Sequence, residues 1–321
     1  MNRLLRASIG LWSLLFAANM TASAQGLAAA RSLAHQGKID AAIAEAQKVT
    51  SATPQSADAQ ELLCKLHGSI DQFDEAIAAC EAAHSAQPGN AAYTLELARA
   101  YGAKADHAGP FTGMRMVGRI RDNFEGAARQ DPKNVDALSD LGEFYVNAPG
   151  VVGGGLDHAR QLVSQLKPLS PARAARLEGM IAAKAGDTTA ADAAYGRELA
   201  VQHSAEAYVD LANYDRKRKL WDQAEQNAVL AIQQDGARGP DSIDAARVLI
   251  DMKRNSAAAE KALRGYLAHE QVSAVAQYAR AHVMLGQLLQ QRGDNAGAED
   301  QFKQALALAG DYSAARKALR K

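Results

Sequence analysis

The sequence is poor in aromatic residues, in cysteine and in net charge. Only 5% of its 321 residues are aromatic, and it has two cysteines and eight prolines. Lysine plus arginine and aspartate plus glutamate each total 36, so the formal net charge is zero. A nucleic-acid binder needs a basic face to neutralise phosphates, and electrostatic attachment to a membrane surface needs a basic cluster. The charge balance argues against both kinds of partner.

After its first 24 residues the chain also lacks a long apolar run. Arg3 and Arg6 give a positive start, an apolar stretch runs from about Ile9 to Ala18, and Ala22-Ser23-Ala24 forms a small-x-small cleavage site before Gln25. This three-part order is typical of a secretory signal peptide. The alternative is an uncleaved membrane anchor, but the apolar stretch is short for a bilayer core of about 30 Å.

We therefore predict a signal peptide over residues 1–24 and an exported mature chain, periplasmic or secreted. No cysteine follows the cleavage site, so a lipoprotein anchor is not expected. No later segment approaches the ~20 apolar residues that a spanning helix needs. The mature protein is expected to be soluble, without a stable membrane anchor.

The chain does have abundant alanine and a helical pattern of apolar residues at i, i+3, i+4 and i+7, which is typical of amphipathic helices. It contains no alternating strand pattern of useful length. Proline disrupts a helix because it lacks an N–H, and glycine permits the backbone of a tight turn. The prolines expected at helix ends are Pro54, Pro88, Pro132 and Pro171, and the glycines expected at turns are Gly37, Gly186 and Gly293.

The helical blocks repeat with a period of 34 residues. This spacing separates Ile39 from Phe73, Ala42 from Ala76, and Pro54 from Pro88. A period of 34 is that of a helix–turn–helix repeat with small residues where the helices touch.

The repeated segments also share a motif of the form W-x2-L-G-x2-Y, A-x3-F-x2-A and a final P. The copy near the C-terminus reads Leu285-Gly286-x2-Leu289 followed by Ala298-x3-Phe302-x2-Ala305. In this motif the chain resembles the tetratricopeptide repeat (TPR) family, and with its signal peptide an exported bacterial TPR protein. The resemblance implies an all-α fold over residues 25–321: a right-handed α-solenoid of about eight TPR-like helical hairpins with a C-terminal capping helix.

Two insertions interrupt the repeat, near residues 105–118 and 148–155. They fall in consecutive repeats, so they are expected to lie near each other. Insertions along one edge of a solenoid often carry partner specificity. The alternative is a lengthened helix and an unstructured turn. Arg115, Arg119 and Arg121 form either a small basic patch or a solvated helix face.

No motif for catalysis or for a cofactor appears. The glycine-rich segment 150–155 follows a helix and is not followed by Gly-Lys-Ser/Thr, so it is not a P-loop. His269-Glu270 lacks the second histidine of a metalloprotease helix, and there is no Gly-x-Ser-x-Gly. We expect no catalytic residues, no cofactor and no enzyme activity.

Cys64 and Cys80 occupy facing positions of one repeat. An exported protein meets an oxidising compartment, so a disulfide between them is plausible, and two buried thiols are the second alternative. A third alternative is a metal site, because His67 and His84 complete the spacing C-x2-H-x12-C-x3-H. The order of these ligands differs from that of familiar zinc modules.

The resemblance also implies a concave groove lined by the first helix of each hairpin, mainly at repeat positions 2, 5, 9, 12 and 13. The predicted groove residues are Lys65, Arg99, Asp136, Ser139, Asn147, Glu206, Val209, Asn213, Met284 and Gln287. They are polar overall and of both signs. A clamp for a C-terminal carboxylate is not expected, because Val209 and Ala245 replace the residues that it needs.

The predicted function is a non-enzymatic scaffold of the bacterial cell envelope that binds a peptide or protein partner in this groove. A second hypothesis is a structural component of an envelope or polysaccharide assembly that uses the convex face and the loops. A third is an accessory domain of a cell-wall enzyme.

Overall fold

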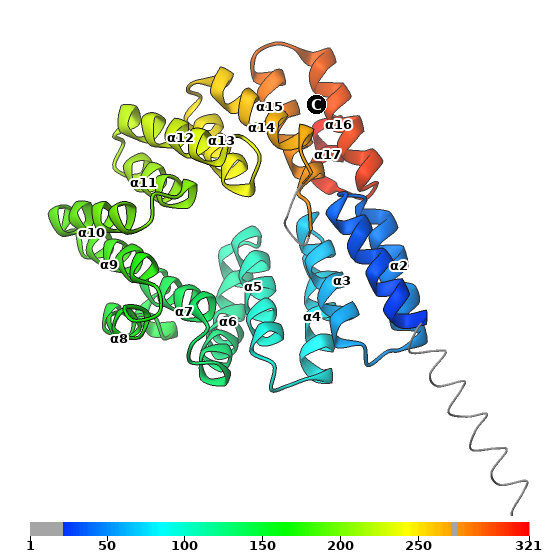
Figure 1. The fold of residues 1–321 in the computed structure, drawn as a ribbon, viewed down its shortest axis with the longest axis horizontal. Coiled ribbons are helices and arrows are strands. Elements are labelled where there is room, and N and C mark those ends of the chain that lie inside the picture. Colours follow the sequence, from blue (N-terminus) through cyan, green and yellow to red (C-terminus); the bar gives the residue numbers. More distant parts are fainter. Residues whose placement is uncertain (1–21, 271–274, 321) are drawn as a thin grey trace, which may run out of the picture.

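The computed structural model describes residues 22–270 and 275–320, and in these residues the chain is helical throughout, without a strand (Figure 1). The predicted all-α solenoid is confirmed. The predicted signal peptide lies outside the described residues, except for residues 22–24 of its cleavage site. These three residues are helical and continuous with the first described helix.

The described helices form eight hairpins and a capping helix. The first helices of the hairpins are residues 22–35, α3 (Ala57–Ser69), α5 (Ala91–His107), α7 (Val135–Asn147), α9 (Pro171–Ala185), α11 (Ala205–Lys217), α13 (Pro240–Met252) and α15 (Tyr278–Gln291). The second helices are α2 (Ile39–Ala52), α4 (Phe73–Ala86), α6 (Pro110–Gln130), α8 (Leu156–Leu166), α10 (Thr188–Val201), α12 (Trp221–Asp235), α14 (Ser256–Ala268) and α16 (Asn295–Leu308). The cap is α17 (Ser313–Ala318).

Small residues set the spacing within and between the hairpins. Ala42, Ala98, Ala224 and Ala298, which hold repeated positions, are at most 1% exposed. A methyl group at these positions lets two helices approach closely and still fill the space between them. The alanine-rich, aromatic-poor composition is therefore a packing requirement of the stacked hairpins.

The predicted turn glycines adopt the backbone that only glycine reaches at low cost. Gly37, Gly186 and Gly293 have φ of 67°, 82° and 85°. Pro54, Pro88 and Pro132 follow the ends of α2, α4 and α6, as predicted. The prediction for Pro171 was wrong, because this residue begins α9 instead of ending α8. Its fixed φ suits a first helical position, and Ser170 caps the helix by accepting from Arg173 N.

The two insertions take different forms. The first lengthens both helices of one hairpin, so that α5 has 17 residues and α6 has 21, on either side of a short turn at 108–109. The second is a loop that contains the 3-10 turn η1 (Gly150–Val152) and two glycines with positive φ, Gly153 and Gly155.

The solenoid closes on itself, so that the first hairpin lies beside the last (Figure 1). Ala276 N donates to Ala34 O at 3.0 Å, and Gly310 N donates to Asp40 Oδ2 at 2.7 Å. One apolar cluster joins Ala34 and Ile39 to Ala309 and Tyr312. We call this contact between the two ends of the described chain the seam. The repeat pattern did not predict it.

The apolar core forms two large clusters, and both of them include residues of α15 and α16. One large cluster reaches from the seam to Ile181 on α9, and a second begins at Val209 on α11. Between them lies only a small cluster around Tyr195 and Tyr214. Among consecutive labelled helices, α10 and α11 make the sparsest contact. We call this place the α10–α11 junction.

No helix within the described ranges is both long enough and apolar enough to cross a membrane.

Candidate functional site

Three hollows run side by side over the C-terminal halves of the first helices. The hollow between α5 and α7 has about 560 Å³, the hollow over α7, α9 and α11 about 630 Å³, and the hollow between α11 and α13 about 460 Å³. The first two share Glu143 and Asn147, and the last two share Arg216 and Lys217. Because each hollow shares lining residues with the next, they form a row from α5 to α13, which we call the inner groove.

The floor of the inner groove follows the repeat register. Each of its central helices contributes the residues one, four and five places after the small residue that packs against the second helix of its hairpin. For α5 these are Arg99, Gly102 and Ala103; for α7, Glu143, Val146 and Asn147; for α9, Met180, Ala183 and Lys184; for α11, Asn213, Arg216 and Lys217. They correspond to repeat positions 9, 12 and 13. Residues at this spacing lie on one face of a helix, so they line the groove together.

An arginine on α9 ties three helices together in the middle of the groove. Arg176 Nη2 donates to Glu143 on α7 at 3.1 Å, and its Nε donates to Asp210 on α11 at 2.9 Å. The side chain of Arg176 is only 19% exposed, so these charge-assisted hydrogen bonds are shielded from water. A similar tie joins Arg99 on α5 to Asp140 on α7 at 2.7 Å.

A buried carboxyl with a raised pKa lies near this arginine. Glu198 on α10 is 4% exposed, and its Oε2 has no hydrogen-bond partner among the described residues. Burial, together with the nearby charge of Asp210, raises the pKa of Glu198 to about 9. At neutral pH this side chain is therefore uncharged, which leaves Arg176 balanced by Glu143 and Asp210 alone.

The groove is predominantly cationic over α9 and α11. Five cationic side chains and two carboxylates line its largest hollow. Three of the cations have partners: Arg176 as described, Arg216 with Asp251 at 3.4 Å, and Arg218 with Asp192 at 2.5 Å. Lys184 and Lys217 are exposed, and neither lies within 4.0 Å of a carboxylate among the described residues.

The other end of the groove is apolar with an acidic rim. Apolar side chains and backbone of α5, α6 and α7 line the hollow there, together with Ala148 and Pro149 from the second insertion and Gly113 from the first. Its charged residues are Arg99, Asp106, Asp140 and Glu143, of which three are acidic. The two insertions therefore line the same hollow.

The predicted basic patch beside the first insertion is largely occupied by internal contacts. Arg119 donates to the Tyr101 hydroxyl at 2.9 Å, and Arg121 pairs with Asp122 at 2.8 Å. Arg121 also packs against Gly153 of the second insertion, where a Cβ would lie 2.8 Å from its Nη1. Arg115 alone stays exposed without a described ion pair.

The predicted groove residues divide into three groups. Arg99, Asn147 and Asn213 line the inner groove. Lys65, Asp136, Glu206 and Gln287 lie at or near the surface outside its walls, where Lys65 pairs with Glu61 and Glu206 with Arg173.

The prediction was wrong for Ser139, Val209 and Met284, which are 7%, 9% and 7% exposed. Each is enclosed where neighbouring first helices pack together, so none is available to a partner. Ser139 Oγ is buried without a partner among the described residues, and Met284 Sδ receives a weak contact from Arg247 Nη2 at 3.9 Å.

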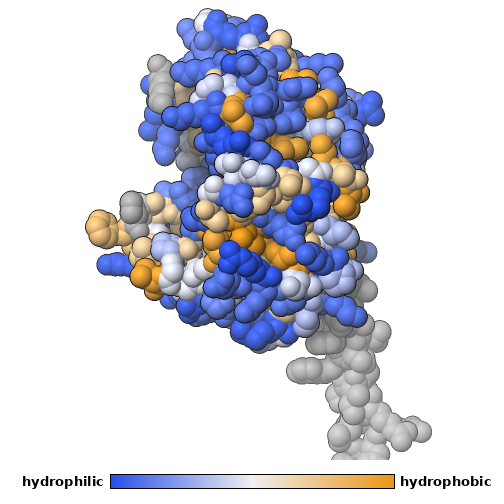
Figure 2. All heavy atoms as spheres, turned by 90° about the vertical axis from the view of Figure 1, so that its left-hand side faces the viewer, coloured by the Kyte–Doolittle hydropathy of each residue, from blue (hydrophilic) through white to orange (hydrophobic). Residues whose placement is uncertain are grey.

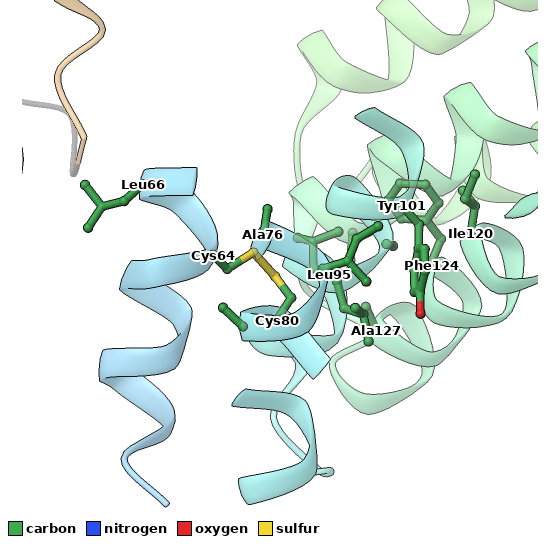
Figure 3. Packing of buried hydrophobic residues seen from close by; sticks show 14 of the residues in the cluster. Cys64, Leu66, Ala76, Cys80, Leu95, Tyr101, Ile120, Phe124 and Ala127 are labelled. Atoms are coloured by element: carbon green, nitrogen blue, oxygen red, sulfur yellow. A yellow bond between two sulfur atoms is a disulfide. The ribbon is translucent and has the colours of Figure 1, made fainter. Parts of the chain in front are cut away.

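Of the three alternatives for the cysteines, the structure has the disulfide. Cys64 on α3 and Cys80 on α4 are bonded with a Cα–Cα distance of 5.2 Å, and Figure 3 shows the bond crossing between the two helices inside the core. The metal site drawn from Cys64, His67, Cys80 and His84 was wrong, because both sulfurs are used. His67 Nδ1 instead lies 2.6 Å from Gln72 Oε1, and His84 Nδ1 lies 3.1 Å from Thr94 Oγ1. No potential metal-binding group of three or more such residues occurs in the described part of the chain.

The outer face has its own apolar features. Figure 2 shows a mainly hydrophilic surface with separate hydrophobic patches on the side of the molecule that carries α8 to α11. Three large apolar side chains of the first insertion and of the second insertion's loop are exposed: Phe111 is 88% exposed, Val151 is 92% exposed and Met114 is 50% exposed.

Sequence reasoning missed Lys184, Arg216 and Lys217, although the signal was present. These residues stand at repeat positions 12 and 13, which were already assigned to the groove. The register of α9 is the hardest to fix from sequence, because Gly179 is the small residue and no large aromatic follows it. Arg176 and Asp210 had no such signal, because their roles depend on an ion pair between different repeats.

We compared the chain with known proteins, and only the comparison of structures gave matches. No protein-family model matches the chain, and no curated protein matches it. Among solved structures, yeast Tom70 is similar over 88% of this chain, with 15% sequence identity and a TM-score of 0.52. This chain spans 57% of the Tom70 chain, and 52% of a chain in the Cut9–Hcn1 complex.

Two further similar structures are those of TPR proteins. A thermophilic TPR protein of Thermus thermophilus has 16% identity and a TM-score of 0.47, over 71% of this chain and 100% of that one. The C-terminal part of a TPR protein from Cytophaga hutchinsonii has 14% identity and a TM-score of 0.43, over 92% of this chain and 100% of that one. With the helical hairpins and their shared motif already established, the chain has the fold of a TPR-type α-solenoid.

Proposed function

We propose that this protein is a non-enzymatic scaffold of the bacterial cell envelope that binds an extended segment of a partner protein in the inner groove. The observation that carries the proposal is a row of adjoining hollows: three hollows extend over five consecutive repeats, and each shares lining residues with the next. An extended chain offers side chains at regular intervals, and a row of adjoining hollows can receive them one after another.

The first helices that line the groove are also tied to one another before any partner arrives. The ion pairs of Arg99 with Asp140, of Arg176 with Glu143 and Asp210, and of Arg216 with Asp251 fix each first helix to the next. A preorganised surface binds more tightly than a mobile one, because less conformational entropy is lost on binding.

The envelope location is supported by two independent features. The order of charged, apolar and small residues in positions 1–24 is that of a secretory signal peptide. Disulfides persist in oxidising compartments such as the periplasm, and Cys64 and Cys80 form one. Export also explains why both cysteines of the chain are used in this bond.

A second candidate function is a structural role in an envelope assembly through the outer face. The exposed Phe111, Met114 and Val151 favour it, because large apolar side chains that project from insertions are typical of contact sites. In that case the partner would be held by the insertions and would not enter the groove.

One experiment separates the two candidates. A photo-crosslinking amino acid is placed at Asn147 in the groove and, in a second protein, at Val151 on the outer loop; both residues are exposed. Each protein is expressed with its signal peptide and irradiated in intact cells. Partner crosslinks from position 147 but not 151 support groove binding. Crosslinks from position 151 alone contradict it and favour the outer-face role, and a purely cytoplasmic product contradicts the envelope location.

A further inference from the structure

Building on the proposed function, we infer that the inner groove selects a partner segment of one charge pattern and one direction. The segment carries acidic side chains over α9 and α11 and a large apolar side chain in the hollow between α5 and α7. The inference rests on the unequal charge of the two ends of the groove.

The first observation concerns cationic side chains without partner carboxylates at the α9 and α11 end of the groove. Lys184 and Lys217 both line the largest hollow, from the last turns of α9 and α11, and no described carboxylate pairs with either. Arg216, which lines two hollows, has a buried Nε without a partner among the described residues. Glu198 does not cancel this charge, because it is protonated at neutral pH. Carboxylates of a ligand would gain charge-assisted hydrogen bonds at this end.

The second step is the aromatic and thioether surface beside these cations. Trp221 is 43% exposed and, with Met252, lines the hollow between α11 and α13 next to Arg216 and Lys217. A tryptophan flanked by cations offers area to an extended backbone and keeps its amphipathic ring at the water boundary. The backbone of an acidic segment can therefore pack against the Trp221 ring while its carboxylates face the neighbouring cations.

The third step is the opposite character of the other end. The hollow between α5 and α7 is walled by Val117, Ile120, Phe124 and Phe144, and Asp106 and Glu143 stand at its rim. Asp106 has no ion pair among the described residues. An apolar side chain gains by burial here, whereas an acidic one is repelled by the unpaired Asp106.

Together the two ends determine direction as well as composition. A segment with an acidic run followed by a bulky apolar residue satisfies both ends in one orientation. Turned around, it places carboxylates beside Asp106 and Glu143 and an apolar side chain among the lysines. Like-charge contacts of this kind suppress the wrong register more than they raise affinity.

The test uses a display library of short random peptides, selected on the mature protein. Two charge-reversed proteins are compared with it: Lys184→Glu with Lys217→Glu in the groove, and Lys133→Glu with Lys261→Glu as a control of equal charge outside the groove walls. All four lysines are exposed and without a described ion pair. Photo-crosslinkers at Ala103, in the hollow between α5 and α7, and at Thr188, in the cationic hollow over α7, α9 and α11, report which part of a bound peptide lies in each hollow.

We expect the selected peptides to be rich in Asp and Glu beside one large apolar residue. The groove variant should weaken their binding at least about tenfold at low salt, with the control variant within about twofold. The apolar part should crosslink to position 103 and the acidic part to position 188. Peptides that crosslink in the groove without acidic bias, or that bind the groove variant equally well, would overturn this inference and leave the proposed function standing. If no selected peptide crosslinks to either position, the proposed function fails with it.

Discussion

The seam and the α10–α11 junction hold the ring together by opposite means. The seam joins residues far apart in sequence, such as Asp40 and Gly310, through an apolar cluster with two hydrogen bonds. The α10–α11 junction joins helices that follow one another directly, and its centre is Glu198 with Asp210 and Arg176. Adjacency along the chain therefore does not by itself guarantee dense packing in this molecule.

The difference shows that a sparsely packed contact can lie in the middle of the chain, away from both ends. In an open solenoid the terminal repeats lack a neighbour and are the first to loosen. Here the first and last hairpins are neighbours of each other, and the sparsest contact between consecutive labelled helices lies in the middle of the chain, at the α10–α11 junction. At the α10–α11 junction the ion pair of Arg176 and Asp210 takes the place of apolar contacts, and a buried ion pair contributes little net stability.

The largest expected effect comes from breaking the seam at Gly37. Its φ is 67°, and a Cβ there would overlap the ring of Tyr278 on α15. Gly37→Ala should lower the free energy of unfolding by about 3 to 4 kcal/mol, from the left-handed backbone and from overpacking together. Urea unfolding followed by circular dichroism measures this change.

Gly293 supplies a matched control for the seam. It has φ of 85° in the turn of another hairpin, but nothing lies within 4 Å of its Cβ position. Gly293→Ala should cost only the backbone penalty, about 1 to 2 kcal/mol. Equal losses for the two variants would mean that the seam contributes nothing to stability.

The second effect concerns the disulfide of the hairpin beside the seam. Leu66 on α3 belongs to the seam's apolar cluster and points away from the Cys64–Cys80 bond in Figure 3. Replacing both cysteines by alanine opens a loop with a separation of 16 residues and should cost about 3 kcal/mol. The midpoint of thermal unfolding reports this loss. A reducing agent should lower the midpoint of the unmodified protein but not that of the variant, and a drop in both would place the effect elsewhere.

The third effect sharpens the comparison at the junction and depends on pH. The folded-state pKa of Glu198 is about 9, above the ordinary 4.5, so between these values the folded chain binds one more proton than the unfolded chain. Rising pH must then lower the free energy of unfolding through this window. Glu198→Gln has no proton to lose, so its stability relative to the parent should rise steadily from pH 5 to pH 8, by more than about 2 kcal/mol. A difference that does not change with pH would refute the assignment of a protonated Glu198.

The smallest expected effect tests whether the lysines of the groove contribute to the stability of the fold. Lys184 and Lys217 are exposed beside the junction and take part in no described ion pair. Lys184→Glu with Lys217→Glu should change the free energy of unfolding by less than about 0.5 kcal/mol. A larger loss would show that the two lysines balance the junction's carboxylates, and their effect on peptide binding would then need to be measured on a stabilised background.

Structural features that recur in every repeat could be predicted from the sequence, whereas features that occur only once in the molecule could not. The period between Pro54 and Pro88 was enough to predict the helical hairpins, and the facing positions of Cys64 and Cys80 were enough to consider a disulfide. The seam depends on how small rotations accumulate over all the repeats, which no local pattern records. The protonated Glu198 depends on its enclosure by three helices, and an acidic residue in an alanine-rich segment gives no sign of that.

The seam changes the mechanics of the molecule. An open superhelix behaves as a spring, because many small rotations between repeats add up to a large change of pitch. A closed hoop has a fixed perimeter, so widening it at one place must narrow it at another. Asp40 and Gly310, which meet at the closure, therefore limit how far the inner face can stretch. A partner that needs a wider opening must first pull the seam apart, and the force required would appear in a single-molecule extension trace as one sharp event before any hairpin unfolds.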